Sequence, residues 1–267
     1  MLTATFSCFD GLSESGEFRL WQQGVLSWSD FESGENFKLS PRKTESIRQQ
    51  IPGARVALEA GIADWFLNRL NSRAKVRVYP HFRDGIRFLD IETTGLGPAA
   101  EVTTIAIYSG KRLSVFVEGI NLHEFPKILK GAELLVTFNG QRFDLPILRK
   151  RFKMGLGLPH LDLLPVAKAN GYHGGLKACE KKMKLKRQVG DDLDGREAVR
   201  LWKRYQNFND LEALRLLLAY NCQDALSLER ILMRLYNDEM CRHPLFMKMT
   251  PGINPDVWEP FRSLTIE

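Results

Sequence analysis

Asp90 and Glu92 are two carboxylates placed two residues apart, within and directly after a short segment, 86–91, that is otherwise mostly apolar and predicts a buried strand. Because side chains alternate along a strand, both carboxylates face the same side of the sheet, about 7 Å apart. Two such groups repel each other and lose hydration, and hard divalent cations such as Mg²⁺ or Mn²⁺ relieve both costs. The alternative is that they cap the following loop or pair with arginines.

A third acid, Asp144, follows a second apolar run at 133–138 and an Asn-Gly turn signal. The sequence after the turn predicts a helix, with Pro146 tolerated in its first turn. A carboxylate at a helix N-terminus is electrostatically favoured, so Asp144 is either an ordinary helix cap or part of an acidic site.

A fourth acid, Asp224, lies in a segment with a strong helical period of apolar residues, from 209 to 236. Tyr220 precedes it by four residues, so the two side chains share one face of the predicted helix. A buried tyrosine near an aspartate is common in helix cores, and this pair has little weight alone.

Taken together, these segments resemble the DEDD (DnaQ-like) superfamily of 3′–5′ exonucleases, which has an RNase H-like fold. The first motif of that family is Asp-x-Glu on the first strand, matched here by Asp90 and Glu92. The second is Asn-x-x-x-Phe/Tyr-Asp, matched by Asn139 through Phe143 and Asp144. Each short motif is weak alone, but their order along the chain strengthens the resemblance.

The third motif distinguishes two versions of the family, one with a histidine five residues before the last aspartate and one with a tyrosine four residues before it. Ala219 excludes the first version, and Tyr220 with Asp224 matches the second, called DEDDy. Further segments resemble the bacterial YprB-type branch, and the resemblance covers roughly residues 80–235. These segments are 135–146, 160–163, 175–180, and 195–198 with Trp202 and Tyr205.

The resemblance implies a site for two divalent cations, Mg²⁺ or Mn²⁺, that hydrolyses phosphodiester bonds. Asp90 is then expected to bridge both ions, with Glu92 and Asp224 completing the ion that activates water. Asp144 is expected to hold the second ion through coordinated waters. Tyr220 is expected to orient the attacking water, since an ordinary tyrosine, with a pKa of about 10, is a poor base near neutrality.

The family pattern also implies substrate contacts at Thr93, Leu96, Asn139 and Phe143. Leu96 and Phe143 are expected to pack against terminal bases, and such stacking contributes roughly 1–3 kcal/mol per base and tolerates any sequence. Phe143 is alternatively an ordinary core residue.

The composition is that of a globular protein with a modestly basic charge. The 267 residues are 44% hydrophobic and 26% charged, with a net charge of +6, which favours a polyanionic partner such as DNA or RNA. No apolar run approaches the ~20 residues of a membrane span, and the first ten residues lack the pattern of a secretory signal. The four cysteines show no metal-binding spacing, so we expect reduced thiols in a cytoplasmic protein.

The fold predicted is α/β: an RNase H-like mixed five-stranded sheet flanked by helices, with a small, mainly helical N-terminal region. We expect three parts, at 1–80, 81–240 and 241–267. The predicted strands are 86–91, 102–108, 112–118, 133–138 and 159–163. The predicted helices are 121–130, 142–153, 174–184, 194–206 and 209–236.

The N-terminal region carries Trp21 and Trp28 within an apolar set, and glycines interrupt that set at 11, 16, 24 and 34. This pattern predicts short helices joined by glycine turns. The tryptophans either pack structurally against the catalytic domain, the interpretation we favour, or stack on bases of a nucleic acid.

Three further groups have open interpretations. His160 and Asp162 form either a structural hydrogen-bonded pair or an extension of the site. The acidic run Asp191, Asp192 and Asp194 predicts an N-terminal cap for helix 194–206. A basic cluster is either a solvated face or a surface that holds phosphates. Its members are Lys177, Lys181, Lys182, Lys184, Lys186 and Arg187.

The resemblance implies a metal-dependent 3′–5′ exonuclease acting on single-stranded ends of DNA or RNA, and the 3′–5′ polarity rests on the resemblance alone. One rival is a structure-specific endonuclease with the same site. The other is a non-catalytic scaffold that binds nucleic acid, and the retention of all four acids with Tyr220 argues against it.

Overall fold

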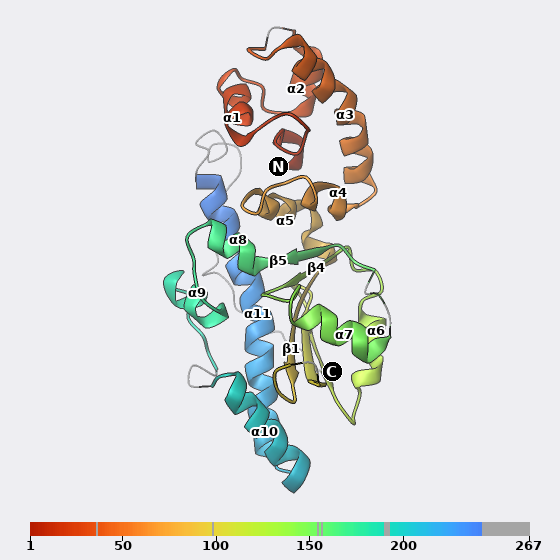
Figure 1. Ribbon diagram of the computed structural model, residues 1–267, viewed down its shortest axis with the longest axis vertical. Coiled ribbons are helices and arrows are strands. Elements are labelled where there is room, and N and C mark those ends of the chain that lie inside the picture. The colour runs from red at the N-terminus through yellow and green to blue at the C-terminus, as the bar shows by residue number, and fades with distance from the viewer. Residues whose placement is uncertain (36, 98, 154, 156, 190–192, 242–267) are drawn as a thin grey trace.

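The computed structural model has an elongated shape, with a helical N-terminal region at one end and a sheet with its covering helices at the other (Figure 1). It describes residues 1–241 except 36, 98, 154, 156 and 190–192. The predicted C-terminal part, 241–267, therefore lies almost wholly outside the described residues.

One mixed sheet of five strands, in the order β3-β2-β1-β4-β5, forms the centre of the larger part. Strands β1, β2 and β3 pair antiparallel, whereas β4 and β5 extend the sheet from β1 in parallel. The predicted five-stranded mixed sheet is thus confirmed. The strands are β1 Ile86–Thr93, β2 Val102–Tyr108, β3 Leu113–Val117, β4 Leu134–Thr137 and β5 His160–Asp162.

Each face of the sheet is buried under different helices, and the alternation of β1 separates the two cores. Leu89 and Ile91 belong to the core shared with α6 (Phe125–Ile128) and α7 (Asp144–Phe152). Phe88 belongs to the other core, which includes the long helix α11 (Leu211–Cys241). Asp90 and Glu92 lie two and four residues after Phe88 on the strand, so their side chains are on the same face as Phe88 and point toward α11.

The helices of the second half follow the predicted order with changes in extent. Helices α9 (Leu176–Lys182) and α10 (Gly195–Phe208) lie where expected. The predicted helix 121–130 is instead a 3₁₀ turn, Leu122–Glu124, followed by the four-residue α6. Proline occupies the first turn of α6, and Gly131 with a positive φ of 77° follows its end.

Helix α8 (Leu163–Ala169) was not predicted, because Pro165 was not recognised as a first-turn proline. The side chain of Asp162 caps it by accepting a hydrogen bond of 3.0 Å from the Leu164 N–H. No described helix combines the length and apolarity that a bilayer crossing requires.

The N-terminal region is helical as predicted, but one of its helices is long. Helix α3 has 19 residues, and Gly16 lies inside α1 rather than in a turn, where an added Cβ would meet Leu12 Cδ1 at 2.7 Å. The helices are α1 Glu14–Gln22, α2 Trp28–Ser33, α3 Pro41–Glu59, α4 Ala63–Leu67 and α5 Tyr79–Phe82.

Trp21 and Trp28 are core residues, which confirms a structural role, but the polar and ring contacts that they make among the described residues lie within the N-terminal region and not against the predicted catalytic domain. Both are buried, and their indole N–H groups donate to the carbonyl oxygens of Ala4 and Thr5, at 2.9 and 3.0 Å. Buried rings with satisfied N–H groups cannot stack on bases.

A buried ion cluster joins the N-terminal region to α11. Arg77 Nη1 donates to Glu17 Oε2 at 2.8 Å, and its Nη2 donates to Glu239 Oε1 at 2.7 Å. All three side chains are almost completely buried, and the apolar core around them runs from the N-terminal helices to α11 without interruption.

Replacement of Arg77 by Met leaves two buried carboxylates without their cation, and we expect it to lower the free energy of unfolding by about 3–5 kcal/mol. Urea denaturation of the two proteins measures this difference. Arg55→Met is the matched control, because Arg55 pairs with Glu32 at the surface and its replacement should cost under about 1 kcal/mol. If the two substitutions lowered the free energy of unfolding equally, Arg77 would not be the cation that stabilises the buried carboxylates.

Candidate metal and nucleic-acid site

Strand β1 and helix α11 bring three acids together. Asp90, Glu92 and Asp224 each contribute one carboxylate oxygen to a group whose members lie within 4.8 Å of one another. Asp90 and Glu92 are half-buried, and Asp224 is buried. Three carboxylate oxygens at this spacing, with little access to water, match the hard oxygen ligands that Mg²⁺ and Mn²⁺ prefer.

The pKa values of these acids also suit a site for a divalent cation. Burial, followed by repulsion from Asp224 and Glu92, raises the pKa of Asp90 well above its usual range. Burial and repulsion from Asp224 and Asp144 raise the pKa of Glu92 to about 8. Burial also raises the pKa of Asp224. A divalent cation bound among them would stabilise the ionised forms.

Asp144 stands beside this group and not within it. It is the first residue of α7 and follows β4, which runs parallel to β1, so the carboxyl ends of both strands meet at one edge of the sheet. Burial raises the pKa of Asp144 to about 7, and its charge contributes to the raised pKa values of Asp90 and Glu92. The position suits a ligand that acts through bound water.

Tyr220 lies on α11 one turn before Asp224 and is buried. Burial, and then the charges of Asp224 and Glu92, raise the pKa of Tyr220 far above its usual range. The phenol therefore stays protonated and acts as a hydrogen-bond donor or acceptor, and it is not a base.

Asn221 fixes the carboxylate of Asp90, and the sequence analysis missed it. Its Nδ2 donates to Asp90 Oδ2 at 2.7 Å and to the Asp90 carbonyl oxygen at 3.1 Å. Its Oδ1 accepts a hydrogen bond of 2.9 Å from the hydroxyl of Thr104 on β2. The feature of the sequence that could have indicated Asn221 is its position, a polar amide next to Tyr220 in the apolar stripe of the predicted helix.

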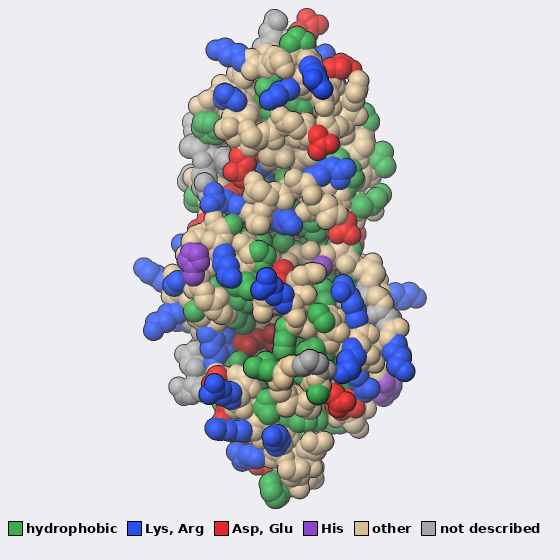
Figure 2. All heavy atoms as spheres, in the orientation of Figure 1, with side chains coloured by type: hydrophobic (Ala, Val, Ile, Leu, Met, Phe, Trp, Pro, Cys, Tyr) green, Lys and Arg blue, Asp and Glu red, His purple; other side chains and the backbone are tan. Residues whose placement is uncertain are grey.

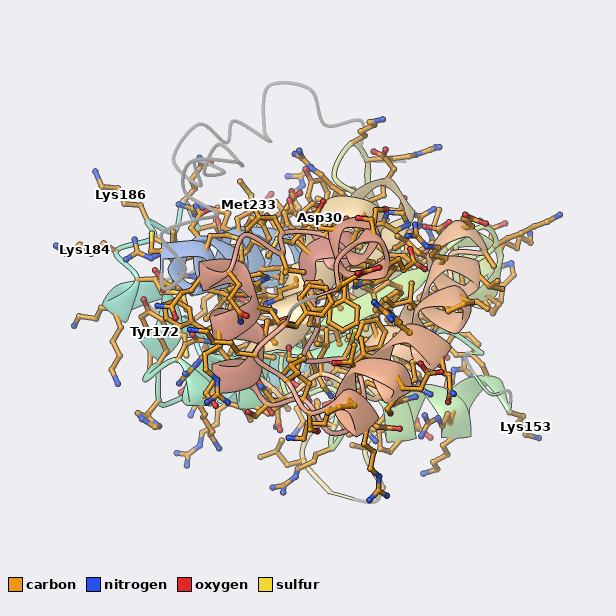
Figure 3. All side chains as sticks on the ribbon, turned by 90° about the horizontal axis from the view of Figure 1, so that it is seen from above. Asp30, Lys153, Tyr172, Lys184, Lys186 and Met233 are labelled. Atoms are coloured by element: carbon orange, nitrogen blue, oxygen red, sulfur yellow. The ribbon has the colours of Figure 1, made fainter. Side chains whose placement is uncertain are left out.

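The basic cluster, for which a solvated face and a phosphate-holding surface were both open, is divided in the structure, and two of its members are not on a solvated face. Arg187 is buried, donates to Glu180 Oε2 at 2.6 Å and also forms an ion pair with Asp224. Lys177 Nζ lies 5.1 Å from the centre of the Tyr220 ring. The exposed members include Lys184 and Lys186, which extend away from the molecule (Figure 3).

A cavity of ≈ 710 Å³, the cleft cavity hereafter, opens beside Glu92. Thr93, Leu96 and Phe143 line one side of it, and residues of α10 line the other. Leu96 is 89% exposed, which is unusual for a leucine and suits a contact with a ligand. The Thr93 hydroxyl already donates to the Gly95 carbonyl oxygen at 2.7 Å.

Helix α10 presents cations to the cleft cavity that the sequence analysis did not assign: Arg196, Arg200 and Lys203. Asp194 caps this helix by accepting from the N–H groups of Arg196 and Glu197, which confirms its predicted role. Asp191 and Asp192 lie outside the described residues. Acidic side chains form a recessed patch on one face, with Lys and Arg side chains around it (Figure 2).

Asn139 is placed away from the cleft cavity and lines another one. Its φ of 65° is left-handed, a conformation that asparagine tolerates better than most residues. The tight turn at 139–143, between β4 and α7, thus separates the Asn139 side chain from Phe143, although both were predicted to contact substrate.

His160 and Asp162 do not bond each other, so the predicted pair is wrong. Asp162 accepts from the backbone N–H groups of Asn139 and Gln141, at 2.7 and 3.2 Å, and so holds that turn. His160 Nε2 lies 2.9 Å from the Thr137 hydroxyl oxygen. Burial lowers the pKa of His160 to about 4, which keeps the ring neutral.

Residues 87–236 match the sequence model of the RNase_H superfamily, which is more than half of the chain. The protein therefore belongs to the RNase H superfamily.

Part of this chain is similar to two DNA polymerases. DNA polymerase 1 of Aeropyrum pernix is 29% identical over 102 residues, 38% of this chain and 9% of the polymerase. The solved family B DNA polymerase of the hyperthermophilic archaeon Pyrobaculum calidifontis has a TM-score of 0.42 and 18% identity. It covers 61% of this chain, which in turn spans 26% of that polymerase.

The raised pKa values of Glu92 and Asp144, about 8 and about 7, predict a pH-dependent stability in EDTA. Their folded forms hold protons that the unfolded chain has released, so their contribution is present at low pH and disappears as pH rises through 7–8. We expect the urea midpoint to fall between about pH 6.5 and about pH 8.5. His160 titrates below this window.

Glu92→Gln should reduce this fall, because it removes one of the groups with a raised pKa, and Mn²⁺ should reduce it in the wild type. Midpoints that stay constant across the window in EDTA would contradict the electrostatic description.

Asn221→Ala should release the Asp90 carboxylate and weaken Mn²⁺ binding about 10–100-fold, as for other residues that orient metal ligands. Thr104→Val removes only the hydroxyl that supports Asn221, and we expect a smaller effect in the same direction. Isothermal titration with Mn²⁺ measures both. Wild-type affinity in Asn221→Ala would show that the hydrogen bond does not position Asp90.

Proposed function

We propose that the protein is a metal-dependent nuclease that hydrolyses phosphodiester bonds of DNA or RNA, as a 3′–5′ exonuclease on single-stranded ends. The observation that carries this proposal is the group of three carboxylates on β1 and α11, with oxygens within 4.8 Å of one another and a tyrosine one turn away. Membership of the RNase H superfamily supports the nuclease class.

The acids fit a pair of divalent cations, Mg²⁺ or Mn²⁺. Asp90, whose carboxylate is fixed by Asn221, would hold the ions together with Glu92 and Asp224, and Asp144 would contribute through bound water. When bound, such ions supply a nucleophile from water at neutral pH and stabilise charge on the phosphate and the leaving oxygen.

The surrounding side chains would bind and orient the substrate and the attacking water. Tyr220, kept protonated, hydrogen-bonds the water and orients it. Lys177 and Arg187 add positive charge next to the acids, where a phosphate must approach. Leu96 and Phe143 offer apolar surface in the cleft cavity for the terminal base.

Two alternatives use the same residues. A structure-specific endonuclease needs the strand to continue past the acids in both directions. A non-catalytic scaffold would have no use for several carboxylates with raised pKa values, because their burial and mutual repulsion destabilise the fold without a bound cation.

Digestion of end-labelled single-stranded DNA and a matching RNA, each with Mg²⁺, Mn²⁺ or EDTA, tests the proposal. We expect a metal-dependent ladder that shortens from the 3′ end. Asp90→Asn should lower the rate by roughly 10³-fold or more, because it removes a ligand shared by both ions. Asp84→Asn is the matched control, since Asp84 is exposed and pairs only weakly with Lys111.

Internal cuts that disappear in Asp90→Asn would keep the site and favour the endonuclease. If neither strand is cut with any metal, or if cleavage persists in Asp90→Asn, the proposed nuclease site is wrong.

A further inference from the structure

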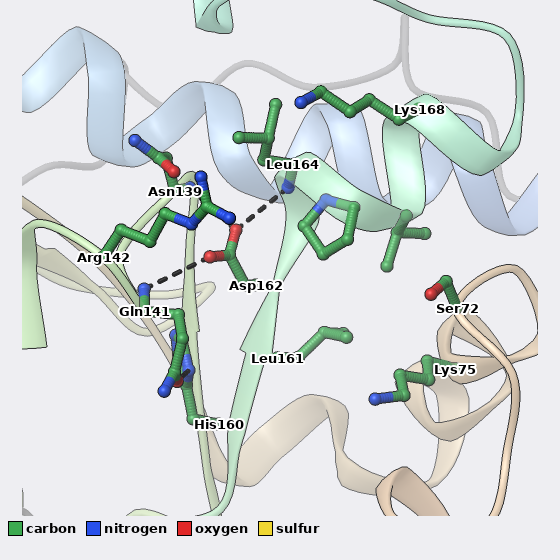
Figure 4. A pocket seen from close by; sticks show the side chains of 12 residues that line it. Ser72, Lys75, Asn139, Gln141, Arg142, His160, Leu161, Asp162, Leu164 and Lys168 are labelled. Carbon is green, nitrogen blue, oxygen red and sulfur yellow. Dashed lines mark hydrogen bonds between the residues drawn. The ribbon is translucent and has the colours of Figure 1, made fainter.

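A second cavity, of ≈ 420 Å³, lies between the N-terminal region and the sheet. Ser72 and Lys75 line it from the N-terminal region, and the turn at 139–142 lines it from the edge of the sheet. The remaining wall comes from β5 and α8, residues 160–168 (Figure 4). Its volume is within the range of small-ligand sites and is close to that needed for one nucleotide of a strand.

The charge of this cavity, called the junction cavity here, is positive. Lys75, Arg142 and Lys168 line it, and none of the three has an ion-pair partner within the part of the chain that the structure describes. The one acid in the lining, Asp162, already accepts three backbone hydrogen bonds. His160 is neutral, because burial lowers its pKa, so an excess of two positive charges remains.

The rest of the lining suits a sugar and a base. Leu164 and Pro165 give one wall apolar surface, whereas Leu161 and Val166, which also line the cavity, are almost completely buried. Asn139 lies at the opposite side, held in its left-handed conformation, with Arg142 next to it (Figure 4). Proteins that bind single strands hold the backbone with cations and stack the bases on aromatic rings. This cavity offers the cations together with an apolar wall.

Residues of the turn between β4 and α7 line both the junction cavity and the cleft cavity. Arg142 lines the junction cavity and also a smaller cavity of ≈ 380 Å³, which it shares with Phe143. Phe143 in turn lines the cleft cavity beside Glu92. The junction cavity and the cleft cavity therefore border the same turn, and a strand that binds in both has to pass over it.

We propose that the junction cavity binds the backbone of the nucleic-acid strand that leads away from the acids. The N-terminal region thereby takes part in substrate binding, through Lys75. This inference rests on the proposed function and gives it a substrate class: a single strand long enough to reach from the acids to Lys75 and Lys168. A mononucleotide or a dinucleotide would not use the cavity.

The test uses the full chain in EDTA and a fluorescein-labelled oligothymidylate of about 20 nucleotides, with binding followed by fluorescence anisotropy over a range of salt concentrations. Removal of one lysine that binds a phosphate should reduce the slope of log K against log salt by about 0.7, so Lys75→Gln with Lys168→Gln should reduce it by about 1.4. Lys168→Gln alone should reduce it by about 0.7. Lys43→Gln with Lys130→Gln is the control, because both lysines are exposed and line neither cavity.

Hydrolysis of bis(p-nitrophenyl) phosphate with Mn²⁺, a substrate too short to reach the junction cavity, separates this inference from the proposed function. Reduced slopes in the junction variants, with wild-type slopes in the controls and unchanged hydrolysis of the short substrate, would support the inference. Unchanged slopes in the junction variants, or an equal reduction of the slope in the control variant, would overturn the inference. A loss of bis(p-nitrophenyl) phosphate hydrolysis in the junction variants would also overturn it. Failure of the wild type to hydrolyse any substrate would reject the proposed function alone, since the binding slopes are measured without metal.

Discussion

The repulsion among buried carboxylates at the crossing of β1 and α11 is the constraint on which this structure depends. Burial raises the pKa values of Asp90, Glu92 and Asp224, and repulsion from Asp224 raises those of Asp90 and Glu92 further. The fold holds them in place with an amide from Asn221 and a guanidinium from Arg187. The protein therefore tolerates an arrangement that is unfavourable without cations, as is common where residues are placed for chemistry and not for stability.

The sequence predicted those features that depend on local periodicity. Alternation along a strand places Asp90 and Glu92 on one face, and the i, i+4 spacing of Tyr220 and Asp224 does the same on a helix. The five strands follow equally from apolar runs and turn residues, and their mixed pairing agrees with the expected sheet.

Residues that act through tertiary contacts were not predictable in the same way. Arg187 reaches Asp224 only because the segment after α9 packs on α11, and in sequence it is one more cation among exposed lysines. Asn221 joins β1 and β2 to α11, across more than one hundred residues of chain. Helix α8 was missed because its proline and its aspartate cap are also typical of a loop.

Helix α11 also determines how the protein can be divided. Its 31 residues extend about 46 Å, and its C-terminal half is covered by the N-terminal region, to which Glu239 is bound through Arg77. A recombinant fragment limited to the superfamily match would expose the apolar face of this half. It would also leave Glu229 without the hydroxyl of Tyr79. The RNase H-like fold and its N-terminal region consequently form one unit for expression, and a truncation at residue 80 would pass through its core.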